Sequence, residues 1–260
     1  MTIERLSIEL TQRCGKACWF CYSRSTPQGS TRFELSEVLR FITDCAANGV
    51  RAVSFGGGEP LEYTGVFALL RELQGVVFRS LTTNGLLLQG ALLEGLVDSR
   101  PDKVHVSIHF PANRQEVQRV ARQVQELEAA GIRSGVNLLV SRNQLAHAEK
   151  AARFLRDAGI GNDRIVYLPM RIRDTPSAGD LARVAGSERF QSMSCLLGCA
   201  KSPRFCAIGW DRSVAHCSYT ARRSTLREPT YTALQRALDG LALSYCGGTD
   251  DGLVRLSRRA

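Results

Sequence analysis

The chain has 260 residues, of which 44% are hydrophobic and 23% charged, as is typical of one large globular domain or a domain with a small appendage. Its 34 Lys and Arg residues exceed its 25 Asp and Glu residues, but these cations do not form one long block, so we do not expect nucleic acid among its partners. No apolar run approaches the roughly 20 residues that span a bilayer, and nine cysteines without a signal peptide indicate a reducing, cytoplasmic setting with metal ligation.

Patterns typical of strands and of helices alternate through the first two-thirds of the chain. We expect strands at residues 4–10, 51–55, 76–81, 104–108, 132–140 and 164–168, and helices at 35–48, 66–73, 91–97, 117–127 and 144–158. Strands that alternate with helices form βαβ units, which place the strands parallel in one sheet. The expected fold class is therefore α/β with six βα units. Residues that follow the strands should share one rim, where such folds place their chemistry.

Three cysteines lie in the loop that follows the first expected strand. Cys14, Cys18 and Cys21 have the spacing C-x3-C-x2-C, which brings three thiolates onto one tight loop. Three thiolates suit three corners of a cubic [4Fe–4S] cluster and leave the fourth iron open to bind and activate another molecule. A structural zinc site needs four ligands, and the odd count of nine cysteines disfavours a disulfide framework. Cys45 falls within a helical pattern and is expected in the core.

A glycine-rich segment, Ser54-Phe55-Gly56-Gly57-Gly58-Glu59-Pro60, follows the second expected strand. Glycines at such a turn let backbone groups approach a ligand closely and adopt angles that other residues avoid. A turn of this kind is weak evidence for a site when it stands alone. Its position one βα unit after the three cysteines makes the combination specific.

Together, the cysteine spacing and Gly57-Gly58-Glu59-Pro60 resemble the cluster motif and the GGEP motif of the radical S-adenosylmethionine (SAM) superfamily. The resemblance covers roughly residues 4–170 and implies a partial (βα)6 TIM-like barrel. It also implies reductive cleavage of SAM at the cluster, which yields a 5′-deoxyadenosyl radical that abstracts hydrogen from a substrate. This chemistry belongs to the cofactor, while the protein orients it and excludes water.

By position, the resemblance also assigns residues to SAM binding. These are Phe20 near the adenine, Gly56, Gly57 and Gly58 at the methionyl amino group with Glu59 in the same motif, Ser107 and Asn137 at the ribose or carboxylate, and Leu168 and Met170 beside the adenine. Core packing or hydrogen bonding at a strand end explains the last four assignments equally well.

Two histidines and an arginine are candidates for catalysis. His105 and His109 share a strand face with Ser107, and a histidine there positions substrate or moves a proton near neutral pH. A hydrogen-bonded structural histidine is an equal alternative. Arg171 and Arg173 suit an anionic substrate or the SAM carboxylate, since arginine binds carboxylates in a bidentate geometry, although a solvated arginine is the simpler alternative.

The βα pattern stops beyond about residue 185, and five of the nine cysteines follow. The segment from Cys206 to Cys217 looks like a cysteine, a short β-hairpin and a second cysteine, with Asp211-Arg212 where the turn is expected. This segment resembles the auxiliary-cluster region of twitch and SPASM domains, which implies a second iron–sulfur cluster; a zinc site or no metal are the alternatives. The implied ligands are Cys195, Cys199, Cys206 and Cys217, with Cys246 as a further candidate.

We therefore expect a radical SAM barrel at residues 1–185 and a cysteine-rich, twitch-like or SPASM-like extension at 186–260. An auxiliary cluster favours net oxidation of a ribosomal peptide or a small metabolite. The alternatives are redox-neutral chemistry on a sugar or nucleoside, and a radical-activating enzyme for a partner protein. The expected electron donor is a protein of the flavodoxin or ferredoxin type, and no membrane partner is expected.

Overall fold

The computed structural model describes residues 2–171, 174–187, 191–192 and 204–243. Within these ranges the chain divides into two compact units. The first unit contains residues 2–104 and 204–243, and the second contains 105–171, 174–187 and 191–192. Strand β4 (Lys103–Ile108) crosses the division. No helix among the described residues is long and apolar enough to cross a membrane.

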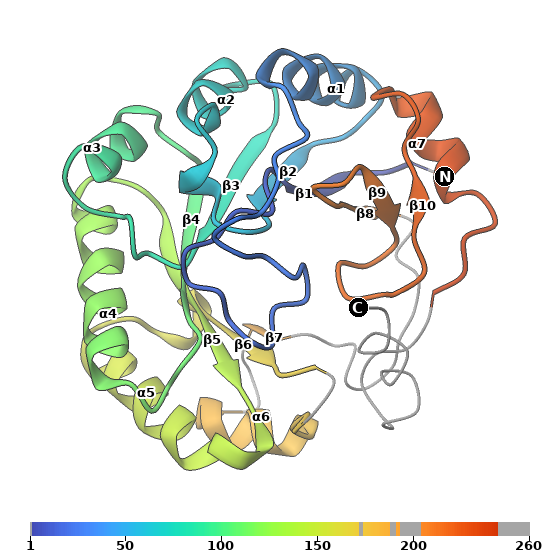
Figure 1. The fold of residues 1–260 in the computed structure, drawn as a ribbon. Helices are drawn as coiled ribbons and strands as arrows, with labels where there is room; N and C mark the ends of the chain where they lie inside the picture. The colour runs from blue at the N-terminus through green and yellow to red at the C-terminus, as the bar shows by residue number, and fades with distance from the viewer. Residues whose placement is uncertain (1, 172–173, 188–190, 193–203, 244–260) are drawn as a thin grey trace. The chain divides into compact units, whose positions relative to one another are not determined.

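The first unit is built on three parallel strands, β1 (Arg5–Glu9), β2 (Ala52–Gly56) and β3 (Phe78–Thr83). Its helices α1 (Leu35–Ala47), α2 (Val66–Glu72) and α3 (Gly90–Asp98) lie along one side of these strands (Figure 1), and the 3-10 turn η1 (Pro60–Glu62) follows the glycine-rich segment.

The two faces of this sheet differ in polarity. Ser7 of β1, Ser54 of β2 and Ser80 of β3 lie in register and are half-buried. Their neighbours on the opposite face, such as Leu6 and Val53, are 1% exposed because they pack under the helices. Alternation of this kind is the pattern of strands with one face in a core and one face left open.

Residues 204–243 complete the first unit. Strand β8 (Phe205–Ile208) pairs parallel with β1, while β9 (Ser213–Ala215) and β10 (Ser224–Thr225) follow antiparallel, which gives the order β10-β9-β8-β1-β2-β3. Helix α7 (Tyr231–Leu238) packs against α1 and β9. The expected hairpin between Cys206 and Cys217 is confirmed, and Arg212 takes the left-handed angle (φ +65°) at its turn that glycine usually supplies. The expected domain boundary at 185/186 stays a prediction.

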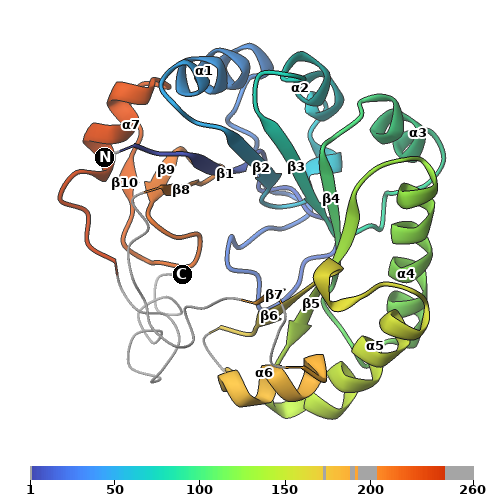
Figure 2. The same cartoon turned by 180° about the vertical axis from the view of Figure 1, so that it is seen from behind.

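The second unit continues the alternation of strands and helices. It contains α4 (Arg114–Ala129), β5 (Ser134–Val140), α5 (Leu145–Asp157), β6 (Ile165–Pro169), α6 (Ala178–Ala185) and β7 (Gln191–Ser192), with 3-10 turns η2 (Arg142–Gln144) and η3 (Asn162–Arg164). Strands β5, β6 and β7 are parallel neighbours. Figure 2 shows α4 and α5 following one another along the outer side of β5.

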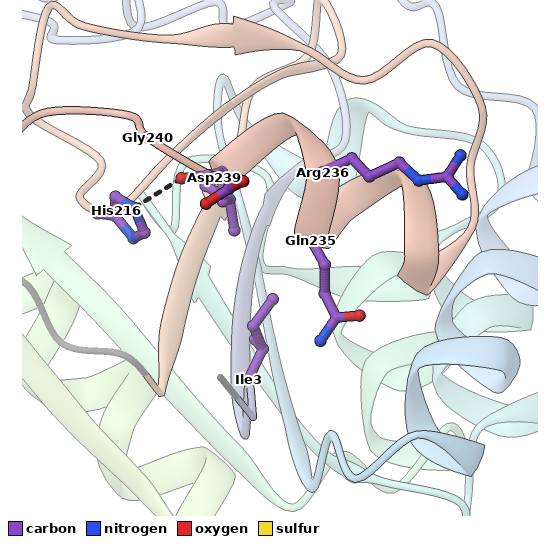
Figure 3. Close-up of a pocket in the computed structure, with 7 residues that line it drawn as sticks. Ile3, His216, Gln235, Arg236, Asp239 and Gly240 are labelled. Carbon is purple, nitrogen blue, oxygen red and sulfur yellow. Dashed lines mark hydrogen bonds between the residues drawn. The ribbon is translucent and has the colours of Figure 1, made fainter.

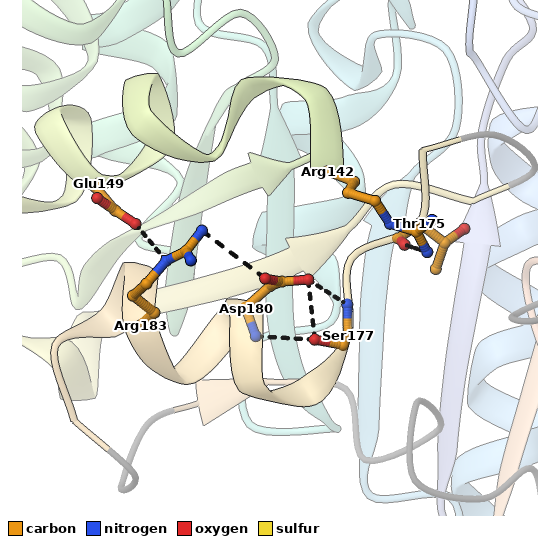
Figure 4. A network of polar contacts seen from close by, with 6 residues as sticks. All are labelled: Arg142, Glu149, Thr175, Ser177, Asp180 and Arg183. Atoms are coloured by element: carbon orange, nitrogen blue, oxygen red, sulfur yellow. Dashed lines mark hydrogen bonds and ion pairs between the residues drawn. The ribbon is translucent and has the colours of Figure 1, made fainter.

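A polar network holds the segment between β6 and α6 (Figure 4). Arg142 donates to the Thr175 carbonyl at 2.6 Å. Ser177 and Asp180 form a reciprocal capping box at the start of α6, and Arg183 pairs with Glu149 of α5 at 2.7 Å. These contacts fix the chain shortly after Arg171.

All six predicted strands and five predicted helices are confirmed, so the α/β fold class is correct. Strand β3 begins at Phe78, two residues later than expected, because Gly75 takes a positive φ of 77° and the chain is still turning at Val76. Helix α4 begins earlier, at Arg114, because the Asn113 side chain caps it by accepting the Glu116 amide at 3.2 Å. Helix α6 was not predicted.

Candidate functional site

The cysteines lie in a loop that folds back on itself directly after β1; we call residues 11–33 the cysteine loop. The Cys14 amide donates to the Thr26 carbonyl at 2.9 Å, and the Gln12 amide donates to the Ser30 carbonyl at 2.9 Å. A tight turn, in which the Cys21 amide donates to the Cys18 carbonyl at 3.0 Å, brings the last two cysteines together. The backbone therefore holds all three cysteines in one compact segment.

Cys14, Cys18 and Cys21 form no disulfide in the part of the chain that the structure describes. Cys14 is 8% exposed and its Sγ accepts a hydrogen bond from Asn84 Nδ2 at 3.6 Å, while Cys18 and Cys21 are half-buried. No group of three or more His, Cys, Asp or Glu side chains in the described ranges converges on a point that could hold a single metal ion. A cubic cluster instead takes one thiolate at each of three different irons.

The glycine-rich turn packs directly on the chain that leads into the cysteine loop. A Cβ at Gly57 would lie 2.0 Å from the Glu9 Cβ, and one at Gly58 would lie 2.3 Å from the Arg13 carbonyl oxygen, so side chains do not fit at these positions. Both glycines also take positive φ angles, 69° and 47°. A Cβ at Gly56, in contrast, would meet no atom within 4 Å, so a ligand can approach the backbone there.

Glu59 ties the glycine-rich turn to the end of β3. Its side chain is fully buried; Oε1 accepts from the Thr83 hydroxyl at 2.7 Å and from the Leu61 amide at 3.1 Å, and Oε2 accepts from the Asn84 amide at 2.8 Å. Burial raises the pKa of Glu59, and these three hydrogen bonds oppose that shift by stabilising the anion. The Glu59 amide also donates to the Arg13 carbonyl at 2.7 Å, which joins the turn to the cysteine loop.

A second buried acid, Glu9, ends strand β1. It is 7% exposed and pairs in register with Gly56, and its Oε2 accepts the Trp210 amide at 3.4 Å. Burial raises the pKa of Glu9 to about 7, although the positive charge of Arg223 and the Trp210 amide act in the opposite direction. Glu9 therefore connects the glycine-rich turn with the hairpin formed by β8 and β9.

These residues fit the implied cofactors. Three cysteine thiols on one folded loop are the donor set of an open-cornered [4Fe–4S] cluster, and an amide N–H already points at one of the sulfurs. Next to them, Gly57 and Gly58 are packed so closely that no side chain fits at either position, whereas the space next to Gly56 is open. Phe20 is half-buried beside Trp19, with a ring-centroid distance of 5.2 Å.

Within the second unit, the structure brings two of the candidate residues together. His105 Nδ1 and Asn137 Oδ1 lie 2.8 Å apart, and Gly135 leaves room for the imidazole, since a Cβ there would lie 2.8 Å from His105 Nε2. Ser107, on the same strand, is 5% exposed. The His109 amide donates to Glu116 Oε1 at 2.6 Å, which anchors the turn after β4.

The other candidates of the second unit lie on and after β6. Leu168 is half-buried and pairs in register with Leu139, whereas Met170 and Arg171 are each 7% exposed. The Met170 amide donates to the Val140 carbonyl at 2.7 Å, so the chain still follows β5 at this point. Arg173 lies outside the described residues.

Of the cysteines expected at a second cluster, Cys195, Cys199 and Cys246 lie outside the described residues. Cys206 is fully buried on β8, in register with Leu6, and burial raises its pKa to about 12. Its neighbour across this core is Cys45 of α1, which is also fully buried, as predicted. Cys217 is half-buried after β9.

A cavity of about 410 Å³ lies near the amino-terminal end of β1, where Ile3 contributes to its wall (Figure 3). His216 Nε2 and the Leu238 carbonyl oxygen, which lie 3.3 Å apart, join two parts of the lining. No residue expected at the SAM or cluster site lines this cavity. Its polar wall consists of His216, Gln235, Arg236 and Asp239.

Sequence reasoning missed two residues of this site, Glu9 and Asn84. Asn84 stood at the expected rim but was not assigned to the cysteines, because its contact with Cys14 spans 70 positions in the sequence. Glu9 carried a signal that was not used: it alternates with Arg5 and Ser7, so a charged side chain ends the open face of the first strand.

The raised pKa of Glu9 predicts a pH-dependent stability. The folded chain holds a proton on Glu9 that the unfolded chain releases above about pH 4.5, so this contribution is complete below pH 4.5 and is lost as the pH rises to about 7. In Glu9→Gln, which stays neutral, the free energy of unfolding should therefore exceed that of the wild type by an amount that grows over this window, by up to roughly 3 kcal/mol. Urea unfolding at several pH values measures the difference.

The matched control for this prediction is Glu94→Gln, because Glu94 is exposed on α3. Its stability relative to the wild type should not change with pH. A Glu9→Gln variant that shows the same flat profile as this control contradicts the prediction.

Comparison with known proteins agrees with this geometry. A family model described as the radical SAM superfamily matches residues 8–176. Curated relatives match part of the chain. A probable GTP 3′,8-cyclase of Methanocella arvoryzae is 37% identical over 106 residues, which cover 41% of this chain and 34% of the relative. A GTP 3′,8-cyclase of Chlorobaculum tepidum is 31% identical over 110 residues, which cover 41% of this chain and 33% of the relative. The matched segment thus spans about a third of either relative.

Solved structures show the same fold over most of the chain. Streptococcus suis SuiB bound to the precursor peptide SuiA has a TM-score of 0.70 at 16% identity, over 84% of this chain and 60% of SuiB. Native anSMEcpe with bound AdoMet and Cp18Cys peptide has a TM-score of 0.62 at 15% identity, and the match covers 88% of this chain and 80% of anSMEcpe. The expected partial barrel is therefore confirmed as the fold. Since the family match covers well over half of the sequence, the chain belongs to the radical SAM superfamily.

Proposed function

We propose that this radical SAM enzyme abstracts hydrogen from a peptide substrate to modify it oxidatively. The observation that carries the proposal is the continuous set of contacts from the glycine-rich turn through Glu59 and Asn84 to Cys14. These contacts hold a SAM-binding surface and three thiols in one compact part of the first unit. When bound, the [4Fe–4S] cluster and SAM supply a 5′-deoxyadenosyl radical.

The chain's own residues have distinct roles in this proposal. Cys14, Cys18 and Cys21 hold the cluster, and the backbone of Gly56–Gly58 binds the methionyl amino group of SAM. Glu59 acts as a positioning residue, because both of its carboxylate oxygens already accept hydrogen bonds from the protein. Asn84 donates to the Cys14 sulfur, and such a bond stabilises the thiolate form that ligates iron.

For residues of the second unit, we propose the contacts that the family resemblance assigns to them. Ser107 and Asn137 contact the ribose or carboxylate, and Leu168 and Met170 flank the adenine. Because Asn137 Oδ1 lies 2.8 Å from His105 Nδ1, His105 orients Asn137. His109 and Arg171 remain candidates for contact with the substrate.

The fold supports a peptide as the substrate. Two proteins with this fold, SuiB and anSMEcpe, have been solved with bound peptides. A row of hydroxyl groups lies on the open face of the first unit, at Ser7, Ser54 and Ser80. Hydroxyl groups both donate and accept hydrogen bonds, so this row suits the backbone of a peptide.

A nucleotide substrate is the second candidate, favoured by the GTP 3′,8-cyclase relatives. Redox-neutral chemistry on a nucleotide would return no electron to a second cluster. Incubation with SAM, reductant and ribose-deuterated GTP distinguishes the candidates. Under the peptide proposal, we expect mass spectrometry to detect no deuterium in 5′-deoxyadenosine; transfer of deuterium would establish the nucleotide alternative instead.

The cluster assignment predicts the behaviour of a Cys14/Cys18/Cys21→Ala variant. After anaerobic reconstitution it should form no 5′-deoxyadenosine from SAM and dithionite, because no ligand remains for the open-cornered cluster. Chromatography of the reaction measures the product. The control is Cys45→Ala, which removes a buried thiol outside the loop and should still cleave SAM. SAM cleavage by the triple variant would overturn the central proposal.

The second cluster is proposed on Cys217 with the earlier candidates Cys195, Cys199 and Cys246, whereas Cys206 is no longer proposed as a ligand. The full burial of Cys206 beside Cys45 supports a core role, whereas the half-buried Cys217 suits a ligand. Reconstituted wild type should contain about 8 Fe per chain, Cys206→Ala should keep that content, and Cys217→Ala should fall toward about 4 Fe. Iron and sulfide analysis measures these values. A wild-type content of about 4 Fe would exclude the second cluster.

A further inference from the structure

The side chain of Asn84 makes a buried hydrogen bond to one cysteine of the cysteine loop. Its Nδ2 lies 3.6 Å from Cys14 Sγ, and the two residues are 6% and 8% exposed. Cys18 and Cys21, in contrast, are half-buried. A hydrogen bond is stronger where water is excluded, because the local dielectric constant is low. Cys14 is the most shielded of the three cysteines, so its sulfur depends on the protein for donors.

The turn after β3 fixes the orientation of the Asn84 amide. The Asn84 backbone amide donates to Glu59 Oε2 at 2.8 Å, and the Leu86 amide donates to Asn84 Oδ1 at 2.8 Å. A reversed side-chain amide would place its NH2 group against the Leu86 N–H and its oxygen against the Cys14 thiolate, so both contacts would be repulsive. Oδ1 is thus committed to the turn, and the N–H donor faces the sulfur.

The groups around Cys14 act on negative charge in opposite directions. Burial raises the pKa of the Cys14 thiol and so do the charges of Glu59 and Glu62, whereas backbone amides lower it. The two carboxylates therefore disfavour any further negative charge at this sulfur. The Asn84 N–H favours such charge, because it is a donor aimed at the same atom.

We propose that Asn84 is a positioning residue that acts through Cys14 to raise the reduction potential of the cluster. The proposal rests on the proposed function, since it requires that Cys14 ligate iron. Reduction adds one electron to the [4Fe–4S] cluster, and part of the added charge resides on the sulfur ligands. A donor at a ligand sulfur stabilises this more negative state more than the oxidised state. The Asn84 side chain thereby makes the cluster easier to reduce.

A purely structural role for Asn84 leads to a different expectation. The turn uses only the side-chain oxygen, and serine also offers an oxygen that can accept an amide two residues further on. The serine hydroxyl is one atom closer to the backbone than Nδ2, so it does not reach the Cys14 sulfur. Asn84→Ser therefore keeps the turn and removes the donor, and under a structural role it would leave the potential unchanged.

The test is a potentiometric titration of reconstituted wild type, Asn84→Ser and the control Asn48→Ser, with dithionite as the source of the electron. EPR of the reduced cluster gives the ratio of reduced to oxidised protein at each potential. The signal that changes when SAM is added identifies the open-cornered cluster. Asn48 is exposed at the end of α1, which leads into the start of β2, so the control makes the same replacement at the opposite end of the sheet from the cysteine loop.

At the wild-type midpoint potential, we expect the reduced-to-oxidised ratio of Asn84→Ser to fall about threefold or more, and that of the control to stay unchanged. Iron and sulfide contents should be equal in all three proteins. A second measurement needs no variant. In wild type that carries ¹⁵N-labelled asparagine, pulsed EPR of the reduced cluster without SAM should detect a coupled ¹⁵N nucleus.

Equal potentials for Asn84→Ser and the control would overturn the proposal, and so would a higher potential in Asn84→Ser. If Asn84→Ser does not hold a full cluster, the labelled wild type decides instead: a ¹⁵N coupling supports the proposal, and its absence overturns it. Absence of 5′-deoxyadenosine from wild type with dithionite and SAM is a different failure. That result rejects the proposed function, whereas an unshifted potential in an enzyme that cleaves SAM rejects only the role of Asn84.

Discussion

The carboxylate of Glu59 accepts hydrogen bonds from the Thr83 hydroxyl and from the amides of Leu61 and Asn84. Each donor left without it would cost about 1–3 kcal/mol, because the site is buried. Through these bonds the glycine-rich turn is held against the end of β3, and Asn84 is oriented so that its amide reaches Cys14. Cys14 and the glycine-rich turn are thus positioned by one buried side chain.

The geometry of the rest of the site depends on the close packing of the glycine-rich turn against the backbone next to it. Gly57 and Gly58 lie against Glu9 and Arg13 with no room for a Cβ. This contact presses the turn onto the chain between β1 and the cysteine loop. Glu9 is buried by the same contact and by the Trp210 amide, which is why its pKa approaches neutrality. The hairpin of residues 205–215 is therefore part of the structure that supports the glycine-rich turn.

The local parts of this site were predictable from sequence, and the long-range parts were not. The spacing of Cys14, Cys18 and Cys21 and the glycines of the turn are short patterns whose chemistry can be read directly. The strands could be predicted from the alternation of apolar and polar residues and from the length of each such run. The Ser177–Asp180 capping box is a sequence signal for the start of helix α6. The helix was nevertheless not predicted, because this short segment after a strand that ends at a proline has no strong helical spacing of apolar residues.

Contacts between distant segments explain the remaining differences. The parallel pairing of β8 with β1 joins residues about two hundred positions apart, and no local pattern selects that partner. The same pairing turns Cys206 toward the buried face shared by Leu6, which spacing between cysteines could not reveal. Arg212 likewise takes a left-handed angle that its side chain does not favour, because the hairpin contacts around it fix the turn.

The absence of acids from the cysteine loop suits the cluster that we propose it holds. Burial raises the pKa of Cys14, with the amides of Lys16 and Ala17 acting against that shift, so binding iron must draw the thiol into its anionic form. Carboxylates close to three thiolates would repel them, whereas cations and amides stabilise them. A cluster offsets part of this positive charge, but Arg222 and Arg227 lie beyond the loop and extend the surplus across the neighbouring segment. The positive charge that favours the thiolates therefore continues beyond the loop that carries them.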